Sequence, residues 1–197
     1  MPADKRTIAN YVDDTLALLT LNTTNKLHAN SMTGWVYKIS EDITSRQKLS
    51  KNRILDVNPY WTDKAFRKHN ENVTSGAKEF HDLHLEHPVP RGKIVHWLCD
   101  LAAPTRRDVE TAVELFSLTC WVTTGASGTP SYIDSEAQAL NKGKYKDFEL
   151  KLNIKDSMPP GWCPLSGDKW SRYKQVQKEK PGLLSDWATL EEQQQRA

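Results

Sequence analysis

Leu83–Lys93 reads L-H-L-E-H-P-V-P-R-G-K, and this stretch decides how the rest of the chain is interpreted. Glu86 and His87 stand side by side at the end of a strand-like segment, and two prolines that flank a valine then lead into Arg91. A carboxylate beside an imidazole can supply a metal ligand and a general base within a few ångströms. We therefore expect this corner to be the functional site and the remaining chain to be its scaffold.

Three interpretations are open for the ionisable side chains at the corner, which are His81, His84, Glu86 and His87. The first is an ordinary polar turn at the surface. The second is a structural zinc site with Cys99 or Cys120 as further ligands, since imidazoles at such spacings bind zinc, although no second ligand pair has standard zinc spacing. The third is a catalytic site.

The bulk composition indicates a globular protein. With 197 residues, 38% hydrophobic and 26% charged, the chain can bury a real core, and we expect one domain over residues 1–175 with a polar tail over residues 176–197. The formal net charge is only +2. Proteins that coat nucleic acid without sequence preference are usually far more basic, so any nucleic-acid contact must come from a local patch.

Cysteine usage and hydropathy bear on the compartment. Cys99, Cys120 and Cys163 are odd in number and widely spaced, which is typical of reduced thiols. The first residues lack the apolar core of a signal peptide, and no apolar run reaches the ~18 residues of a membrane span. These features predict a cytoplasmic protein without a membrane partner.

Periodicity predicts mostly helices, with a few short strands. Thr62 is expected to cap one helix, and Thr105 with Asp108 resembles a capping box at the start of another. Helices are expected at residues 6–21, 62–70, 94–101, 105–116 and 131–142. Strands are expected at residues 34–39, 118–124 and 148–154, and a further strand is expected to end in Glu86-His87. The predicted fold class is α+β, a mostly helical single domain with a small ββα-like metal-site corner.

The order of segments around the corner resembles that of the HNH, or ββα-metal, nucleases. In that family a strand ends in an acidic residue plus His followed by a hydrophobic-Pro pair, much like E-H-P-V-P at residues 86–90. A second strand follows, and a helix then returns an Asn or His to the metal. Residues 121–124 look like the second strand and residues 131–140 like the returning helix. Two further helices are expected between the paired strands of this chain, where the family has a loop.

The resemblance implies a role for individual residues. Glu86 would bind a divalent metal, Mg²⁺ or Mn²⁺ with Zn²⁺ as an alternative, and His87 would be the general base. The returning helix has no His or Asn at a clear ligand position, so Asp134 and Glu136 are the available substitutes. A neutral imidazole with a pKa of about 6.5 can accept a proton from water at neutral pH. Arg91 or Lys93 could hold a neighbouring phosphate.

The expected function is that of a divalent-metal-dependent endonuclease that hydrolyses DNA phosphodiesters, in a setting such as restriction or phage defence. The alternative is a non-catalytic module that binds nucleic acid or protein, in which the same corner is a structural turn. DNA is the expected partner of the nuclease, and a homodimer would suit an enzyme that cuts palindromic sites.

Overall fold

The computed structural model describes residues 7–25, 29–48, 59–124, 136, 140, 158–179 and 181–196. Contacts within the chain divide it into two compact units, each assembled from separate stretches of sequence. Unit 1 comprises Met1–Val57, Val89–Leu118 and Gly161–Lys169. Unit 2 comprises Asn58–Pro88, Thr119–Pro160 and Trp170–Ala197.

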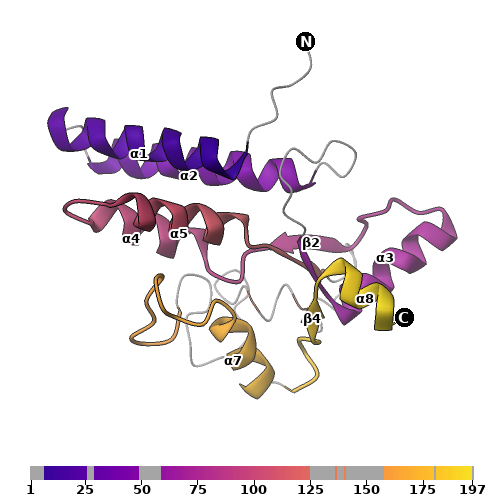
Figure 1. The fold of residues 1–197 in the computed structure, drawn as a ribbon. Coiled ribbons are helices and arrows are strands. Elements are labelled where there is room, and N and C mark those ends of the chain that lie inside the picture. The colour runs from indigo at the N-terminus through magenta and orange to yellow at the C-terminus, as the bar shows by residue number, and fades with distance from the viewer. Residues whose placement is uncertain are drawn as a thin grey trace, which may run out of the picture. The chain divides into compact units, whose positions relative to one another are not determined.

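Unit 1 is built from helices. They are α1 (Ile8–Asn25), α2 (Ala29–Lys48), α4 (Arg91–Asp100) and α5 (Arg106–Ser117). Helix α1 lies against α2 and α5, and α4 lies against α2 and α5, so the four helices share one core (Figure 1). The strongest stripe is on α5, where Val109, Ala112, Val113 and Phe116 are fully buried, as their spacing predicts.

The start of α5 shows how the sequence sets a helix boundary. The Thr105 side chain accepts a hydrogen bond from the backbone N–H of Asp108, and the Asp108 carboxylate accepts one from the backbone N–H of Thr105 at 2.8 Å. This reciprocal arrangement satisfies two backbone donors that the first helical turn leaves without partners. The predicted capping box is confirmed.

The strand predicted at residues 34–39 is wrong, because these residues lie inside helix α2. The aromatic and β-branched composition favoured a strand locally. A longer helical stripe overrides it: Met32, Val36, Ser40 and Ile43 are all buried and recur at spacings of three and four. Trp35, one position away from Val36, stays 60% exposed because it lies off this stripe.

Unit 2 contains a small mixed sheet. Its strands are β1 (Tyr60–Thr62), β2 (Leu83–Glu86), β3 (Cys120–Thr123) and β4 (Trp187–Ala188), in the order β2-β3-β1-β4. Strand β3 pairs in parallel with β1 and antiparallel with β2, and β4 is antiparallel to β1. The strand predicted to end in Glu86-His87 is present and ends at Glu86, and the strand predicted at residues 118–124 is present as its neighbour.

The two faces of β3 belong to different cores, as the alternation of side chains along a strand requires. Cys120 and Val122 point into a cluster with Tyr173 of α7 (Ser171–Glu179). Trp121 points into the other cluster, where its ring lies 5.6 Å from that of Trp61 and 4.7 Å from that of Phe80. Most of the described aromatic residues of unit 2 therefore pack in one of these two cores.

Helix α3 (Asp63–Ser75) directly follows β1. Thr62 caps it by accepting a hydrogen bond from the backbone N–H of Ala65 at 3.2 Å, as predicted. Gly76 ends it with a φ of 71°, a left-handed conformation that favours glycine. The helix runs further than the predicted end at residue 70.

Residues 176–197, expected as a polar tail, contain the end of α7, strand β4 and helix α8 (Leu190–Arg196). In β4, Ala188 pairs with Trp61. Gln193 of α8 is buried, and its side-chain amide donates to the carbonyl oxygen of Trp61 at 3.0 Å. This segment belongs to unit 2.

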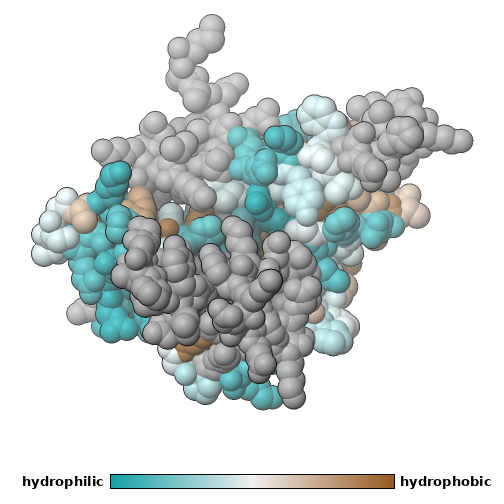
Figure 2. All heavy atoms as spheres, turned by 180° about the vertical axis from the view of Figure 1, so that it is seen from behind, coloured by the Kyte–Doolittle hydropathy of each residue, from teal (hydrophilic) through white to brown (hydrophobic). Residues whose placement is uncertain are grey.

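The structure confirms the predicted α+β class, with helices predominating over a small sheet. Most of the described atoms on the face shown in Figure 2 are hydrophilic or intermediate, and hydrophobic atoms appear only in small areas. None of the described helices is long and apolar enough to cross a bilayer. The predicted helix at residues 131–142 and strand at residues 148–154 fall largely or wholly outside the described residues.

Candidate active site

Glu86 ends strand β2 and forms an ion pair with Arg172 of helix α7. The Arg172 Nη2 atom donates to Glu86 Oε1 at 2.7 Å, and the side chains are 2% exposed for Arg172 and 12% for Glu86. The charge of Arg172 therefore acts on the carboxylate with little screening by solvent. Arg172 was not among the residues predicted for the site.

The electrostatics of Glu86 result from opposing effects. Burial, the largest effect, raises its pKa, whereas the positive charge of Arg172 and the hydrogen bonds from His84 and Arg172 lower it. The lowering effects win, and the pKa falls from the ordinary 4.5 to about 2. Glu86 is thus a carboxylate throughout the physiological pH range.

His87 is buried, with 8% of the residue exposed. Its carbonyl oxygen accepts a hydrogen bond from Arg172 Nη2 at 2.5 Å. One guanidinium nitrogen therefore contacts both Glu86 and His87, and fixes the backbone where β2 ends. Arg172 is a positioning residue for this dipeptide.

His84 lies two residues before Glu86 on the same face of β2. Its Nε2 atom lies 3.5 Å from Glu86 Oε2, and its side chain is 46% exposed. The Glu86 carboxylate therefore faces Arg172 with one oxygen and the half-exposed His84 imidazole with the other.

Glu136 lies in a different network. Its Oε2 atom accepts from Thr62 Oγ1 at 2.6 Å and from the backbone N–H of Thr123 at 3.0 Å. Its Oε1 atom accepts from the backbone N–H of Ser185 at 2.9 Å and from its hydroxyl at 2.5 Å. The carboxylate is fully buried and connects β1, β3 and the segment before β4.

The predicted metal ligands Glu86 and Glu136 lie at different positions along β3. In the β2·β3 register Glu86 pairs with Cys120, whereas Glu136 binds Thr123 three residues along β3, a separation of about 10 Å along the strand. Asp134 lies outside the described residues. Within the described ranges no group of three His, Cys, Asp or Glu side chains is placed to hold a metal ion.

One pair of donors is spaced as a tetrahedral metal site requires, which is the geometry of zinc rather than of Mg²⁺. Two ligand atoms at about 2.1 Å from a metal ion lie about 3.4 Å apart in a tetrahedral site and about 3.0 Å apart in an octahedral site. Nε2 of His84 and Oε2 of Glu86 are separated by 3.5 Å and come from the same face of β2. His84 is therefore a better companion for Glu86 than Glu136, whose two oxygens are occupied by hydroxyl and amide donors.

Arg91, predicted to hold a phosphate, is the first residue of α4 and is counted with unit 1, whereas Glu86 and His87 belong to unit 2. The same division applies to Cys99, which the zinc interpretation offered as a ligand. Cys120 is in unit 2 but fully buried, and burial followed by the negative charge of Glu136 raises the pKa of its thiol well above 9.0. Zinc binds the thiolate, so this environment disfavours Cys120 as a ligand.

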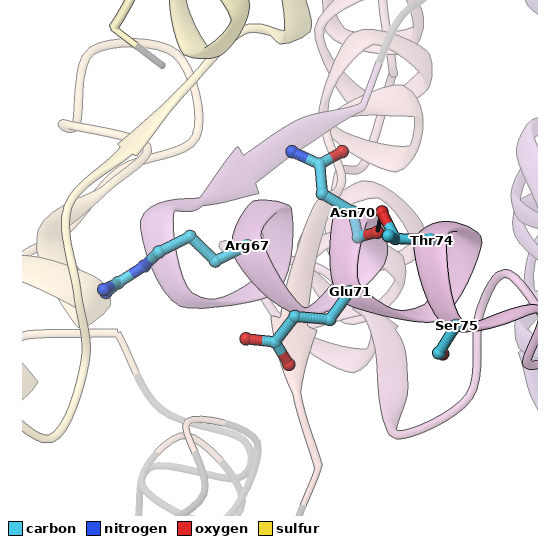
Figure 3. Close-up of a pocket in the computed structure, with 5 residues that line it drawn as sticks. All are labelled: Arg67, Asn70, Glu71, Thr74 and Ser75. Atoms are coloured by element: carbon cyan, nitrogen blue, oxygen red, sulfur yellow. Dashed lines mark hydrogen bonds between the residues drawn. The ribbon is translucent and has the colours of Figure 1, made fainter.

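A second candidate surface lies on the exposed side of α3. A hollow of about 610 Å³ is lined there by polar side chains of this single helix. They are Arg67, Asn70, Glu71, Thr74 and Ser75, and Figure 3 shows them spread along the helix with Arg67 and Ser75 at opposite ends. The side chains do not converge on one point, so this hollow does not resemble a catalytic site.

No family model, curated protein or solved structure matches the chain. The assignment of function therefore depends on the residues and their geometry.

Proposed function

We propose that the protein is a divalent-metal-dependent endonuclease of the ββα-metal type, acting on DNA phosphodiesters. The observation that carries this proposal is the antiparallel pairing of β2 with β3, which makes the segment ending in Glu86-His87 one half of a two-stranded unit although α4 and α5 intervene in the sequence. Glu136 and Leu140, which follow β3, have helical backbone conformations. The order β2, β3 and then helical residues resembles that of the motif, with α4 and α5 added between the two strands.

The roles follow from the site geometry. Glu86, which is ionised at neutral pH, and His84 would hold the metal ion, which when bound supplies positive charge to the scissile phosphate. The His87 imidazole would take the proton from the attacking water. Arg172 would act through the His87 carbonyl and the Glu86 carboxylate by fixing the dipeptide that carries both functions.

The Arg172–Glu86 ion pair is also the observation that favours the non-catalytic alternative. A buried guanidinium already neutralises Glu86, and its charge opposes the binding of a cation at the same carboxylate. In that case the corner is a structural turn of a binding module, and its charged residues serve only to hold unit 2 together.

Incubation of supercoiled plasmid with the protein and magnesium or manganese separates the two functions. We expect nicking by the wild-type chain and loss of nicking in His87→Ala. His81→Ala is the matched control, because it also removes an imidazole, but one that is 52% exposed and contacts Asp82 and not Glu86. Retention of full metal-dependent nicking by His87→Ala would refute the assignment of the base, and absence of nicking by every protein would favour the binding module.

A further inference from the structure

A second pocket lies in unit 1, on the exposed side of α4. Its volume is about 310 Å³, at the lower end of the range of small-molecule sites. Helix α4 contributes Lys93, His96, Trp97 and Asp100, and Leu101 follows directly after the helix. The segment after Gly161 contributes Trp162 and Pro164. All of these residues belong to unit 1.

The α4 side of the pocket is a single helical stripe. Lys93, His96, Trp97 and Asp100 recur at spacings of three and one, which places them on one face. The opposite face of the helix carries fully buried apolar residues that pack in the core of unit 1, namely Ile94, Val95 and Leu98. The stripe is therefore not needed to hold the helix in place.

The charged and polar groups of the stripe are available to a ligand. In the part of the chain that the structure describes, the side chains of Lys93, His96 and Asp100 make no hydrogen bond or ion pair with one another or with other residues. A cation, an imidazole and a carboxylate thus surround a hollow that two indole rings also line.

Trp162, on the other side of the pocket, is held in a fixed orientation. Its Nε1 atom donates to the carbonyl oxygen of Asp168 at 2.9 Å. A Cβ atom at Gly167 would lie 2.4 Å from the Trp162 ring, so only glycine permits the ring to lie where it does. The amide of Gly167 donates in turn to the carbonyl oxygen of Cys163 at 2.6 Å, which closes a tight turn around the indole. This preorganisation reduces the entropy cost of binding at the ring face.

We propose that this pocket binds a nucleobase together with its neighbouring phosphate. The Trp97 and Trp162 rings would stack on the base, Asp100 would accept a hydrogen bond from an amino group of the base, and Lys93 would pair with the phosphate. This inference rests on the proposed function, since it assigns to the same protein a site for one unpaired nucleotide of a nucleic acid.

The first test is a titration of the full chain with 2′-deoxyadenosine 5′-monophosphate, followed by tryptophan fluorescence in the presence of a chelator. We expect saturable quenching by both the wild-type chain and His87→Ala. Trp97→Ala and Trp162→Ala should bind about tenfold more weakly, the fold-change that corresponds to loss of one stacked ring. Trp35→Phe, which changes an exposed tryptophan of α2 outside the pocket, should bind as the wild type does.

Two conservative variants test the pocket without removing a ring. Lys93→Met should weaken binding of the nucleotide but leave binding of 2′-deoxyadenosine unchanged, because only the former carries the phosphate. Asp100→Asn should weaken binding of both. A single-stranded oligonucleotide that binds more tightly than the nucleotide identifies a strand as the natural source, and equal affinity identifies a free nucleotide.

The proposal is overturned if the wild-type chain binds neither the nucleotide nor the oligonucleotide, or if the variants of the pocket bind as the wild type does. Preference for a free aromatic amino acid such as tyrosine over the nucleotide would also overturn it. Because the titration needs neither metal nor cleavage, its failure is distinguishable from failure of the plasmid assay.

Discussion

Replacing Arg172 with Met should destabilise unit 2 strongly, because it leaves the Glu86 carboxylate in a largely buried site without its counter-charge. Arg172 is 2% exposed and Glu86 12% exposed at the side chain, so water replaces the lost guanidinium poorly. Breaking a buried ion pair from one side costs about 3–5 kcal/mol. We expect a loss of that size in the free energy of unfolding at neutral pH.

The lowered pKa of Glu86 gives a figure of similar size for the combined effect of burial, Arg172 and His84 on its charge. The fall from the ordinary value of 4.5 to about 2 corresponds to roughly 3 kcal/mol of stability, at about 1.36 kcal/mol per pKa unit. Because the folded-state pKa is lowered, this stability is fully present above pH 4.5 and is lost as the pH falls toward 2. At a pH of about 3, about 2 kcal/mol of it should already be lost.

Urea unfolding followed by circular dichroism measures both effects. The double variant Glu86→Gln/Arg172→Met is the control, since it removes both charges, and it should be more stable than Arg172→Met alone. Glu86→Gln should lose less stability than the wild type between neutral pH and a pH of about 3, by about 2 kcal/mol. An Arg172→Met variant within about 1 kcal/mol of the wild type, or a double variant no more stable than the single one, would refute the reasoning.

Two further predictions concern the buried Glu136 carboxylate and the Thr105 cap. Glu136→Gln should lower the free energy of unfolding by about 3 kcal/mol, because it replaces one oxygen that accepts from Thr62 or Ser185 with an amide donor. The control Glu110→Gln, at an exposed position of α5, should change the free energy of unfolding by less than about 0.5 kcal/mol. Equal effects of the two substitutions in a chemical unfolding experiment would contradict the buried role. Thr105→Ala should cost about 1 kcal/mol by the same measurement, whereas Thr105→Ser should retain most of the stability because the hydroxyl remains. If the serine variant were as unstable as the alanine variant, the cap would not be the cause.

Features of the fold that depend on neighbouring residues were predictable from the sequence. The caps at Thr62 and Thr105 each involve a partner three residues away, and the structure contains both. The buried stripe of α5 follows from local periodicity, and the strand predicted at residues 118–124, present at Cys120–Thr123, follows from local composition. The strand prediction for residues 34–39 was wrong because it used the composition of six residues and not the longer apolar stripe of α2.

The candidate site was predicted only in its local half. The adjacency of Glu86 and His87 is visible in the sequence, but Arg172 lies 86 residues from Glu86 along the chain. The signal for Arg172 was its place between Trp170 and Tyr173, two aromatic residues whose rings pack beside Trp187. An arginine within an apolar anchor needs an acidic partner, and this argument could have pointed to a carboxylate such as Glu86.

The pairing of β1 with β4 has a consequence for the order in which the chain is made. Strand β1 is synthesised early, but its neighbours β3 and β4 and the Gln193 amide that binds the Trp61 carbonyl, 132 residues further along, leave the ribosome much later. During translation both edges of β1 are therefore unpaired at first. The core that Trp61 shares with Trp121 can form only after Trp121 has been made. Sheet formation in unit 2 is thus expected late in synthesis, because β1 gains its paired neighbours only after β3 and β4 have been made.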